Sequence, residues 1–193
     1  MNKPFLIFVE GSQGTGKSTV CRELRERLKY TTLLDLNAIE DKSEEAEDKM
    51  YHYHGRALEM FEGCIHLGMN FVVGRSYQSE KVYCNLGYKP YDFELFSHLL
   101  RQELDYLSKY YDIYFILLTA TEEQLKERLK RDKAEYHKFS VENSLAQQEE
   151  YKKEMKILAE ETKNIKVFEI ENDNLSRTVS TIKDIILTGM IGE

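Results

Sequence analysis

The sequence contains no tryptophan, only two prolines and only three cysteines among its 193 residues. The cysteines, Cys21, Cys64 and Cys84, are too few and too scattered for a disulfide framework, and none forms the Cys-x-x-Cys spacing of a zinc or redox site. We therefore expect them to be buried free thiols. No Pro- or Gly-rich linker divides the chain, which favours a single domain over residues 1–193.

Long apolar runs are also missing. The two longest, residues 5–9 and 113–118, are far shorter than the ~20 residues that cross a bilayer. The first run is also too short for the hydrophobic part of a signal peptide, so the sequence predicts a cytoplasmic protein with no membrane partner. Acidic residues outnumber basic ones by 34 to 27, and this balance argues against broad binding to nucleic acid.

Short apolar runs alternate with helical patterns along the chain. Apolar residues recur three or four positions apart between the runs, as at Val20, Leu24 and Leu28. This alternation predicts an α/β fold, with one five-stranded, mostly parallel sheet, helices on both faces, and ligands beyond the carboxyl ends of the strands. The predicted strands include residues 5–9, 31–34, 71–73, 113–118 and 167–170, of which 31–34 is the weakest.

A phosphate-binding loop follows the first apolar run. Residues 11–18 match G-x-x-x-x-G-K-[ST] at every fixed position and precede an amphipathic helix, whose amino end favours anions. Lys17 supplies an ammonium group for the β and γ phosphates, and the Ser18 hydroxyl is placed to bind Mg²⁺. The pattern predicts ATP and Mg²⁺ as cofactors, with nucleotide contacts from Gly11, Ser12, Gln13, Gly14, Thr15, Gly16, Lys17, Ser18 and Thr19.

A phosphate loop indicates a nucleotide but not a reaction. GTPases identify guanine through an Asn-Lys-x-Asp segment, which does not occur in this sequence. Motor and transport ATPases add domains for which the chain has no room. A small-molecule kinase remains, and the sequence leaves ATP and GTP open as phosphate donors.

Beyond this loop, the sequence resembles the thymidylate kinase and deoxynucleoside kinase group of P-loop kinases. Glu10 leads into the loop as in that family, and Arg75 and Ser79 keep the family spacing within Val-Val-Gly-Arg-Ser-Tyr-Gln-Ser. The segment Glu-Arg-Leu-Lys-Arg-Asp at 127–132 looks like part of the family lid, which we place at about residues 128–142. The resemblance implies a P-loop NTPase fold with a helical lid, a nucleotide or nucleoside substrate and, as an option, a homodimer.

Two departures leave the phosphate acceptor open. Gly74 stands where the family has an acidic residue, so a carboxylate usually assigned to the Mg²⁺ water shell or to the substrate is missing. The segment that follows the second predicted strand also lacks the arginine-proline-glycine run of thymidylate kinases.

Asp35 follows the second predicted strand and opens into the expected crevice. By resemblance to several P-loop kinases, it would take the proton of an acceptor hydroxyl during phosphoryl transfer. With a monophosphate acceptor, it would instead hold a water molecule of the Mg²⁺ shell. Capping of a turn is the structural alternative.

Two arginines of the predicted lid, Arg128 and Arg131, lie three residues apart on one face of a helix. A guanidinium that arrives on closure stabilises the charge of a transferring phosphoryl group more than that of the bound ground state. The alternative is a surface helix with an ion pair between Glu127 and Arg131.

The sequence thus predicts an ATP- and Mg²⁺-dependent kinase that acts on a nucleoside monophosphate, with a deoxynucleotide such as dTMP as first choice. One alternative is a hydroxyl acceptor, either a deoxynucleoside, another small alcohol or a nucleic-acid 5′ end. The other is a regulatory nucleotide-binding module without transfer activity, which Gly74 favours. The predicted catalytic residues are Lys17, Asp35, Arg75, Arg128 and Arg131, and the predicted metal ligands are Ser18 and Asp35.

Overall fold

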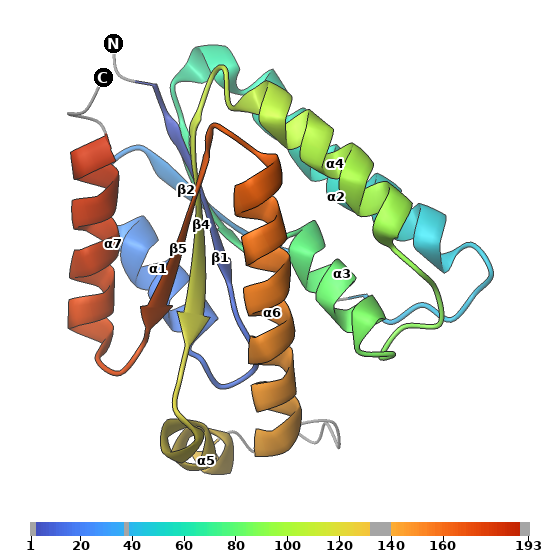
Figure 1. The fold of residues 1–193 in the computed structure, drawn as a ribbon. Coiled ribbons are helices and arrows are strands. Elements are labelled where there is room, and N and C mark those ends of the chain that lie inside the picture. Colours follow the sequence, from blue (N-terminus) through green and yellow to red (C-terminus); the bar gives the residue numbers. More distant parts are fainter. Residues whose placement is uncertain (1–2, 37–38, 132–139, 190–193) are drawn as a thin grey trace.

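A computed structural model of the chain describes residues 3–36, 39–131 and 140–189. Its apolar runs form a five-stranded parallel sheet in the spatial order β2-β3-β1-β4-β5 (Figure 1). The predicted α/β fold with a parallel sheet is therefore confirmed, including its weakest strand. The strands are β1 (Phe5–Glu10), β2 (Thr31–Asp35), β3 (Asn70–Gly74), β4 (Asp112–Thr119) and β5 (Ile165–Glu171).

Helices cover both faces of the sheet. In Figure 1, α1 and α7 lie on one side, while α2, α3, α4 and α6 lie on the other, and α5 lies beyond the carboxyl end of β4. The helices are α1 (Lys17–Arg27), α2 (Ala46–Gly63), α3 (Tyr77–Asn85), α4 (Glu94–Leu107), α5 (Glu122–Arg131), α6 (Val141–Glu161) and α7 (Leu175–Gly189), and a 3-10 turn, η1 (Ile65–Leu67), precedes β3.

Strand β1 lies at the centre of the sheet and is buried along its whole length. Because side chains alternate along a strand, Leu6 and Phe8 face one core and Ile7 and Val9 face the other. The same alternation puts Glu10, the last residue of β1, on the side of Leu6 and Phe8. A carboxylate therefore ends a row of core residues directly before the phosphate loop.

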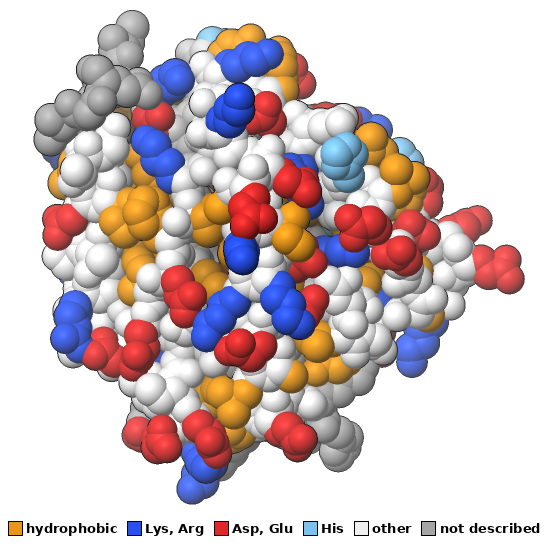
Figure 2. Space-filling view, in the orientation of Figure 1, with side chains coloured by type: hydrophobic (Ala, Val, Ile, Leu, Met, Phe, Trp, Pro, Cys, Tyr) orange, Lys and Arg blue, Asp and Glu red, His pale blue; other side chains and the backbone are white. Residues whose placement is uncertain are grey.

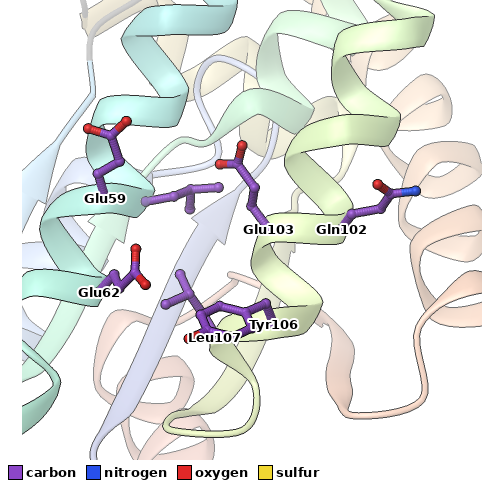
Figure 3. A pocket seen from close by; sticks show the side chains of 7 residues that line it. Glu59, Glu62, Gln102, Glu103, Tyr106 and Leu107 are labelled. Atoms are coloured by element: carbon purple, nitrogen blue, oxygen red, sulfur yellow. The ribbon is translucent and has the colours of Figure 1, made fainter.

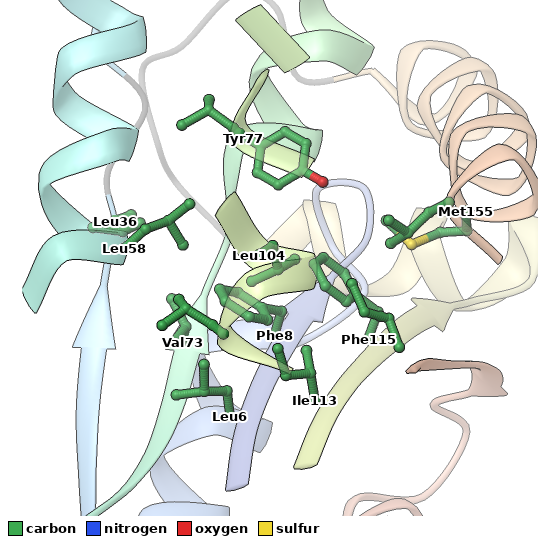
Figure 4. Packing of buried hydrophobic residues seen from close by; sticks show 14 of the residues in the cluster. Leu6, Phe8, Leu36, Leu58, Val73, Tyr77, Leu104, Ile113, Phe115 and Met155 are labelled. Carbon is green, nitrogen blue, oxygen red and sulfur yellow. The ribbon is translucent and has the colours of Figure 1, made fainter. Parts of the chain in front are cut away.

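The two cores differ in composition. The core under α2, α3, α4 and α6 is rich in aromatic rings, and Phe8 stacks on Phe115 with ring centroids 4.7 Å apart (Figure 4). The core under α1 and α7 is mostly aliphatic and includes Leu24 and Ile182. The two cores pack against opposite faces of the sheet, and the carboxyl ends of its parallel strands lie along one edge. In parallel α/β sheets that edge carries the ligand site, at the point where the connections diverge to either side of the central strand.

Lysine and arginine side chains are interspersed with acidic ones on the face shown in Figure 2, without a broad basic patch there. Among the described residues, no helix is both long enough and apolar enough to cross a membrane. The three cysteines are free; Cys21 is buried, whereas Cys64 and Cys84 are half-buried. The expectation of buried thiols is therefore met fully only at Cys21.

Candidate nucleotide-binding site

The phosphate loop connects the end of β1 to the start of α1, and two of its glycines cannot carry a side chain. Gly11 has a φ of 141°, and a Cβ atom there would lie 2.4 Å from the Leu118 carbonyl oxygen. Gly16 has a φ of 87°, and its Cβ atom would lie 2.7 Å from Asn172 Nδ2. The loop therefore takes a left-handed, closely packed course that other residues disfavour. Among the described residues, no side chain caps α1 at Gly16, and the amino end of such a helix favours an anion.

Lys17 lies within this loop. Its ammonium group donates to the carbonyl oxygen of Gly11 and, at 2.8 Å, to that of Ser12. Burial, together with the positive charge of Arg75, lowers the pKa of Lys17 to about 7, although the negative charges of Glu10 and Asp35 oppose this effect. A phosphate group would favour the charged form of Lys17, because it adds negative charge beside the ammonium group.

Side chains from two helices and from the segment between β5 and α7 contact the backbone of the loop from outside. Arg128 of α5 donates to the Gly14 carbonyl oxygen at 3.3 Å and also to the Asn172 carbonyl oxygen. The Asn172 side chain, which precedes α7, donates to the Thr15 carbonyl oxygen at 2.7 Å. From α6, the Gln147 side chain accepts from the Gln13 amide at 3.4 Å. These contacts hold the shape of the loop.

Arg128 contacts the outside of the phosphate loop, at the carbonyl oxygens of Gly14 and Asn172. That a lid arginine reaches the γ-phosphoryl group only on closure stays a prediction. Arg131 is the last residue of α5, and its side chain lies outside the described part of the chain, as do residues 132–139 of the predicted lid. The role of Arg131 stays a prediction.

The glycine at position 74 is related to the carboxylate of Asp35. They are paired in register at the ends of β2 and β3. A Cβ atom at Gly74 would lie 2.8 Å from Asp35 Oδ1, which is closer than such atoms approach. The carboxylate of Asp35 therefore occupies the space next to residue 74, where the resemblance led us to expect an acidic side chain. The departure at Gly74 makes room for a carboxylate that comes from the neighbouring strand.

Arg75 has an unusual backbone conformation. Its φ is 71°, in the left-handed region that non-glycine residues seldom adopt, and its amide donates to the Val9 carbonyl oxygen at 3.2 Å. The next residue, Ser76, caps α3 by accepting from the Gln78 amide at 3.1 Å. The turn between β3 and α3 thus fixes Arg75 beside the end of β1. Strained positions of this kind are common at functional sites.

A buried chain of polar groups links β1 to two helices. Ser79 Oγ of α3 donates to Glu10 Oε2 at 2.7 Å, and the Tyr151 hydroxyl of α6 lies 2.7 Å from the same Ser79 oxygen. In the sequence, Glu10 and Ser79 stood out through the family resemblance, but neither they nor Tyr151 had a predicted role. A further signal is the acidic residue that ends a continuous apolar strand, because a carboxylate at such a position needs buried partners.

A cavity of about 450 Å³ lies elsewhere, between α2 and α4 (Figure 3). Leu58 and Leu107 are among its apolar lining residues, and Glu59, Glu62 and Glu103 surround them. Its lining includes neither the phosphate loop nor a strand end, so it is not part of the nucleotide site. Among the described residues, no group of three His, Cys, Asp or Glu side chains could hold a metal ion.

Known proteins support the assignment of the fold. A family described as AAA domain matches residues 7–152, which is more than half of the chain. A search of curated proteins finds no match.

Three solved structures share the architecture. The YorR protein of Bacillus subtilis, in complex with phosphorylated GDP, has a TM-score of 0.72 and 17% identity over 97% of this chain and 99% of that one. Thymidylate kinase from Candida albicans has a TM-score of 0.61 and 16% identity over 98% and 93%. Deoxyadenosine kinase from M. mycoides with bound dATP has a TM-score of 0.59 and 17% identity over 94% and 99%.

At these identities the structural likeness concerns the fold, and at that level it confirms the resemblance to the thymidylate kinase and deoxynucleoside kinase group. Together with the phosphate loop between β1 and α1, the family match shows that the chain belongs to the AAA domain family of P-loop proteins.

Proposed function

We propose that this protein is a kinase that transfers the γ-phosphate of ATP to a nucleoside monophosphate, with a deoxynucleotide such as dTMP as the first candidate. One observation carries the proposal. The charges of Arg75 and Asp35, from the ends of β3 and β2, both act on Lys17 in the phosphate loop. A phosphate-binding ammonium, an arginine and a carboxylate therefore gather at one edge of the sheet.

The residues present fit Mg²⁺ as well as ATP. Ser18 and Asp35 are both exposed, and their oxygen atoms are of the kind that Mg²⁺ prefers. We assign the metal to these two residues, together with phosphate oxygens and water. When bound, Mg²⁺ would neutralise part of the negative charge of the phosphates.

The protein groups then have distinct roles in the transfer. The acceptor oxygen forms a bond to the γ-phosphorus while the bond to the β–γ bridging oxygen breaks, and ADP leaves. Lys17 and the first amides of α1 hold the phosphate oxygens, and Arg75 faces the charge that spreads over them. Arg128 and Arg131 are the candidates for a guanidinium from the lid.

A hydroxyl acceptor is the second candidate, and the exposed carboxylate of Asp35 favours it. An ionised carboxylate at that position can take the hydroxyl proton as the new bond forms. A monophosphate oxygen needs no such base. The same carboxylate beside Gly74 weighs against a module without transfer activity, because it supplies the acidic group that glycine lacks.

The names of the structural neighbours also support a kinase, because two of them are a thymidylate kinase and a deoxyadenosine kinase. They do not select one acceptor. A cytoplasmic location and a homodimer stay predictions from the sequence.

The proposal is tested by a transfer screen with radiolabelled ATP and GTP over nucleosides and their monophosphates. We expect label on a deoxynucleoside monophosphate, and Lys17→Ala should lower turnover at least ~10²-fold. Normal transfer by Lys17→Ala would show that the phosphate loop is assigned wrongly. Nucleotide binding without transfer to any acceptor would favour the regulatory alternative.

A further inference from the structure

Glu10 is a buried carboxylate that the mechanism above does not use. It is 0% exposed and ends the central strand β1 directly before the phosphate loop. Ser79 donates to its Oε2 atom at 2.7 Å, whereas Oε1 has no hydrogen-bond partner within the part of the chain that the structure describes. A buried carboxylate oxygen without a partner is costly, so something else must stabilise this charge.

The hydrogen bonds behind Glu10 have a fixed direction. The Ser79 hydroxyl has a single hydrogen, and it donates this hydrogen to Glu10 Oε2. Ser79 must then accept from the Tyr151 hydroxyl, which lies 2.7 Å away. Burial raises the pKa of Tyr151 well above its ordinary value, so its hydroxyl keeps its proton. The chain of hydrogen bonds therefore runs from Tyr151 on α6 through Ser79 on α3 to Glu10 on β1.

Lys17 and Arg75 are each anchored to a neighbour of Glu10 in the sequence: the Lys17 ammonium group donates to the Gly11 carbonyl oxygen, and the Arg75 amide donates to the Val9 carbonyl oxygen. Burial raises the pKa of the Glu10 carboxyl, while the hydroxyls of Ser76 and Ser79 and the charges of Lys17 and Arg75 favour its ionised form. Arg75 disfavours the charged form of Lys17, and Glu10 opposes this. The carboxylate thus offsets the repulsion between two cations that must act on the same phosphate group.

We propose that Glu10 is a positioning residue, which holds Lys17 and Arg75 together at the phosphate site and is itself fixed from α6 through Ser79 and Tyr151. The inference rests on the proposed phosphoryl transfer, because it assigns the two cations to one transferring group. Glu10 acts through these side chains and does not touch the substrate.

This role predicts an unusual separation of binding from turnover. Removal of a negative charge beside a phosphate site leaves ATP binding equal or makes it tighter, because ATP is an anion. The two cations then lose the charge between them and move apart, which disturbs their alignment with the transition state. A residue with a merely structural role would weaken ATP binding and turnover together.

The test compares Glu10→Gln with the wild-type protein at pH 8, which favours the ionised carboxylate. We expect kcat to fall about tenfold to 10²-fold, with an equal or lower Kd for a fluorescent ATP analogue. An unchanged kcat would overturn the inference, and so would a Kd that rises in proportion to the loss of kcat.

The far end of the chain gives a second test if Glu10→Gln does not fold. Tyr151→Phe removes only the terminal donor, and we expect it to lower kcat a few-fold with ATP affinity retained. Tyr111→Phe is the matched control, because its hydroxyl is also buried in the aromatic core but donates to the Phe61 carbonyl oxygen at 2.9 Å. Equal kcat values for the two variants would overturn the inference.

The experiment also separates this inference from the proposed function. Transfer by the wild-type protein with no change in Glu10→Gln would refute the inference and leave the kinase assignment intact. If the wild-type protein transfers phosphate to no acceptor, the kinase proposal fails. In that case, an equal or lower Kd for the ATP analogue in Glu10→Gln would still support the inference that Glu10 offsets the repulsion between Lys17 and Arg75. A higher Kd would overturn it.

Discussion

The phosphate loop and the region beside the ends of β2 and β3 hold their polar groups in different ways. In the loop, Arg128 and Asn172 bind backbone carbonyl oxygens and thereby fix its shape. Beside the ends of β2 and β3 the polar groups are side chains. We propose that the acceptor binds there and call the surroundings of Asp35, Glu80 and Lys89 the acceptor region. A backbone cradle suits the phosphates that all nucleotides share, whereas side chains can distinguish one acceptor from another.

A buried ion pair ties this acceptor region together. Lys89 lies 3.3 Å from Glu80, which also accepts from the Tyr91 hydroxyl. Lys89 donates in addition to the carbonyl oxygen of Ile39, in the segment that follows β2. This hydrogen bond joins the segment that follows β2 to the segment between α3 and α4, 50 residues away in the sequence. Removal of either charge alone would leave the other charge buried without an opposite charge, so we expect substitution of Lys89 or Glu80 alone to destabilise the region.

The largest expected effect in the acceptor region concerns Asp35→Asn. If Asp35 takes a proton from an acceptor hydroxyl, the substitution should cost ~10² to 10⁴ in rate. With a monophosphate acceptor the loss should be much milder. The measurement is kcat with each acceptor identified in the transfer screen, at several Mg²⁺ concentrations.

The matched control for this experiment is Asp105→Asn, at an exposed aspartate on α4. It should leave kcat unchanged. A strong loss in Asp35→Asn with dTMP as acceptor, while the Mg²⁺ dependence is unaltered, would count against a monophosphate as the natural acceptor.

The second effect concerns stability and the buried His54 of α2. Burial, together with the nearby charge of Lys89, lowers the pKa of His54 to about 4, so the folded protein keeps the ring neutral above that pH. The unfolded chain takes up a proton near pH 6.5. Between pH 6.5 and 4 the unfolded state therefore binds more protons, and stability is lost as the pH falls. From pH 7 to pH 5 this contribution amounts to about 2 kcal/mol.

Urea unfolding at pH 7 and pH 5 measures this contribution as a difference between variants. His54→Gln should show a smaller loss of unfolding free energy at pH 5 than the wild-type protein, whatever its stability at pH 7. His66→Gln, at an exposed histidine, should lose as much as the wild type. Parallel losses in all three proteins would mean that His54 does not remain neutral in the fold.

The sequence predicted the sheet and the phosphate loop because both depend on neighbouring residues. A strand buried on both faces is one apolar run, as in β1 and β4, so it is visible without knowledge of its partners. The phosphate loop is likewise a contiguous motif whose conformation follows from its glycines. Local physics fixes both features.

The contacts that complete the site were not predictable in this way. Ser79 lies 69 residues after Glu10 in the sequence, and Tyr151 lies 72 residues after Ser79. Only the packing of α3 and α6 brings the three residues together. The sequence also presented Gly74 as the loss of an acidic group. Only the register of β2 against β3 shows that Asp35 takes up that space.

The smallest expected effect tests directly whether the Asp35 carboxylate replaces the acidic group that is missing at Gly74. A methyl group at position 74 would place its carbon 2.8 Å from Asp35 Oδ1, so Gly74→Ala should push the carboxylate out of its position. Because small displacements of an aligned group lower catalytic rates, we expect kcat to fall about tenfold with little change in ATP affinity. Gly63→Ala is the matched control, since nothing lies within 4 Å of an added methyl group there, and it should retain the wild-type kcat. If Gly74→Ala is as active as Gly63→Ala, the position of the Asp35 carboxylate does not matter for transfer, and the acceptor region must rely on other groups.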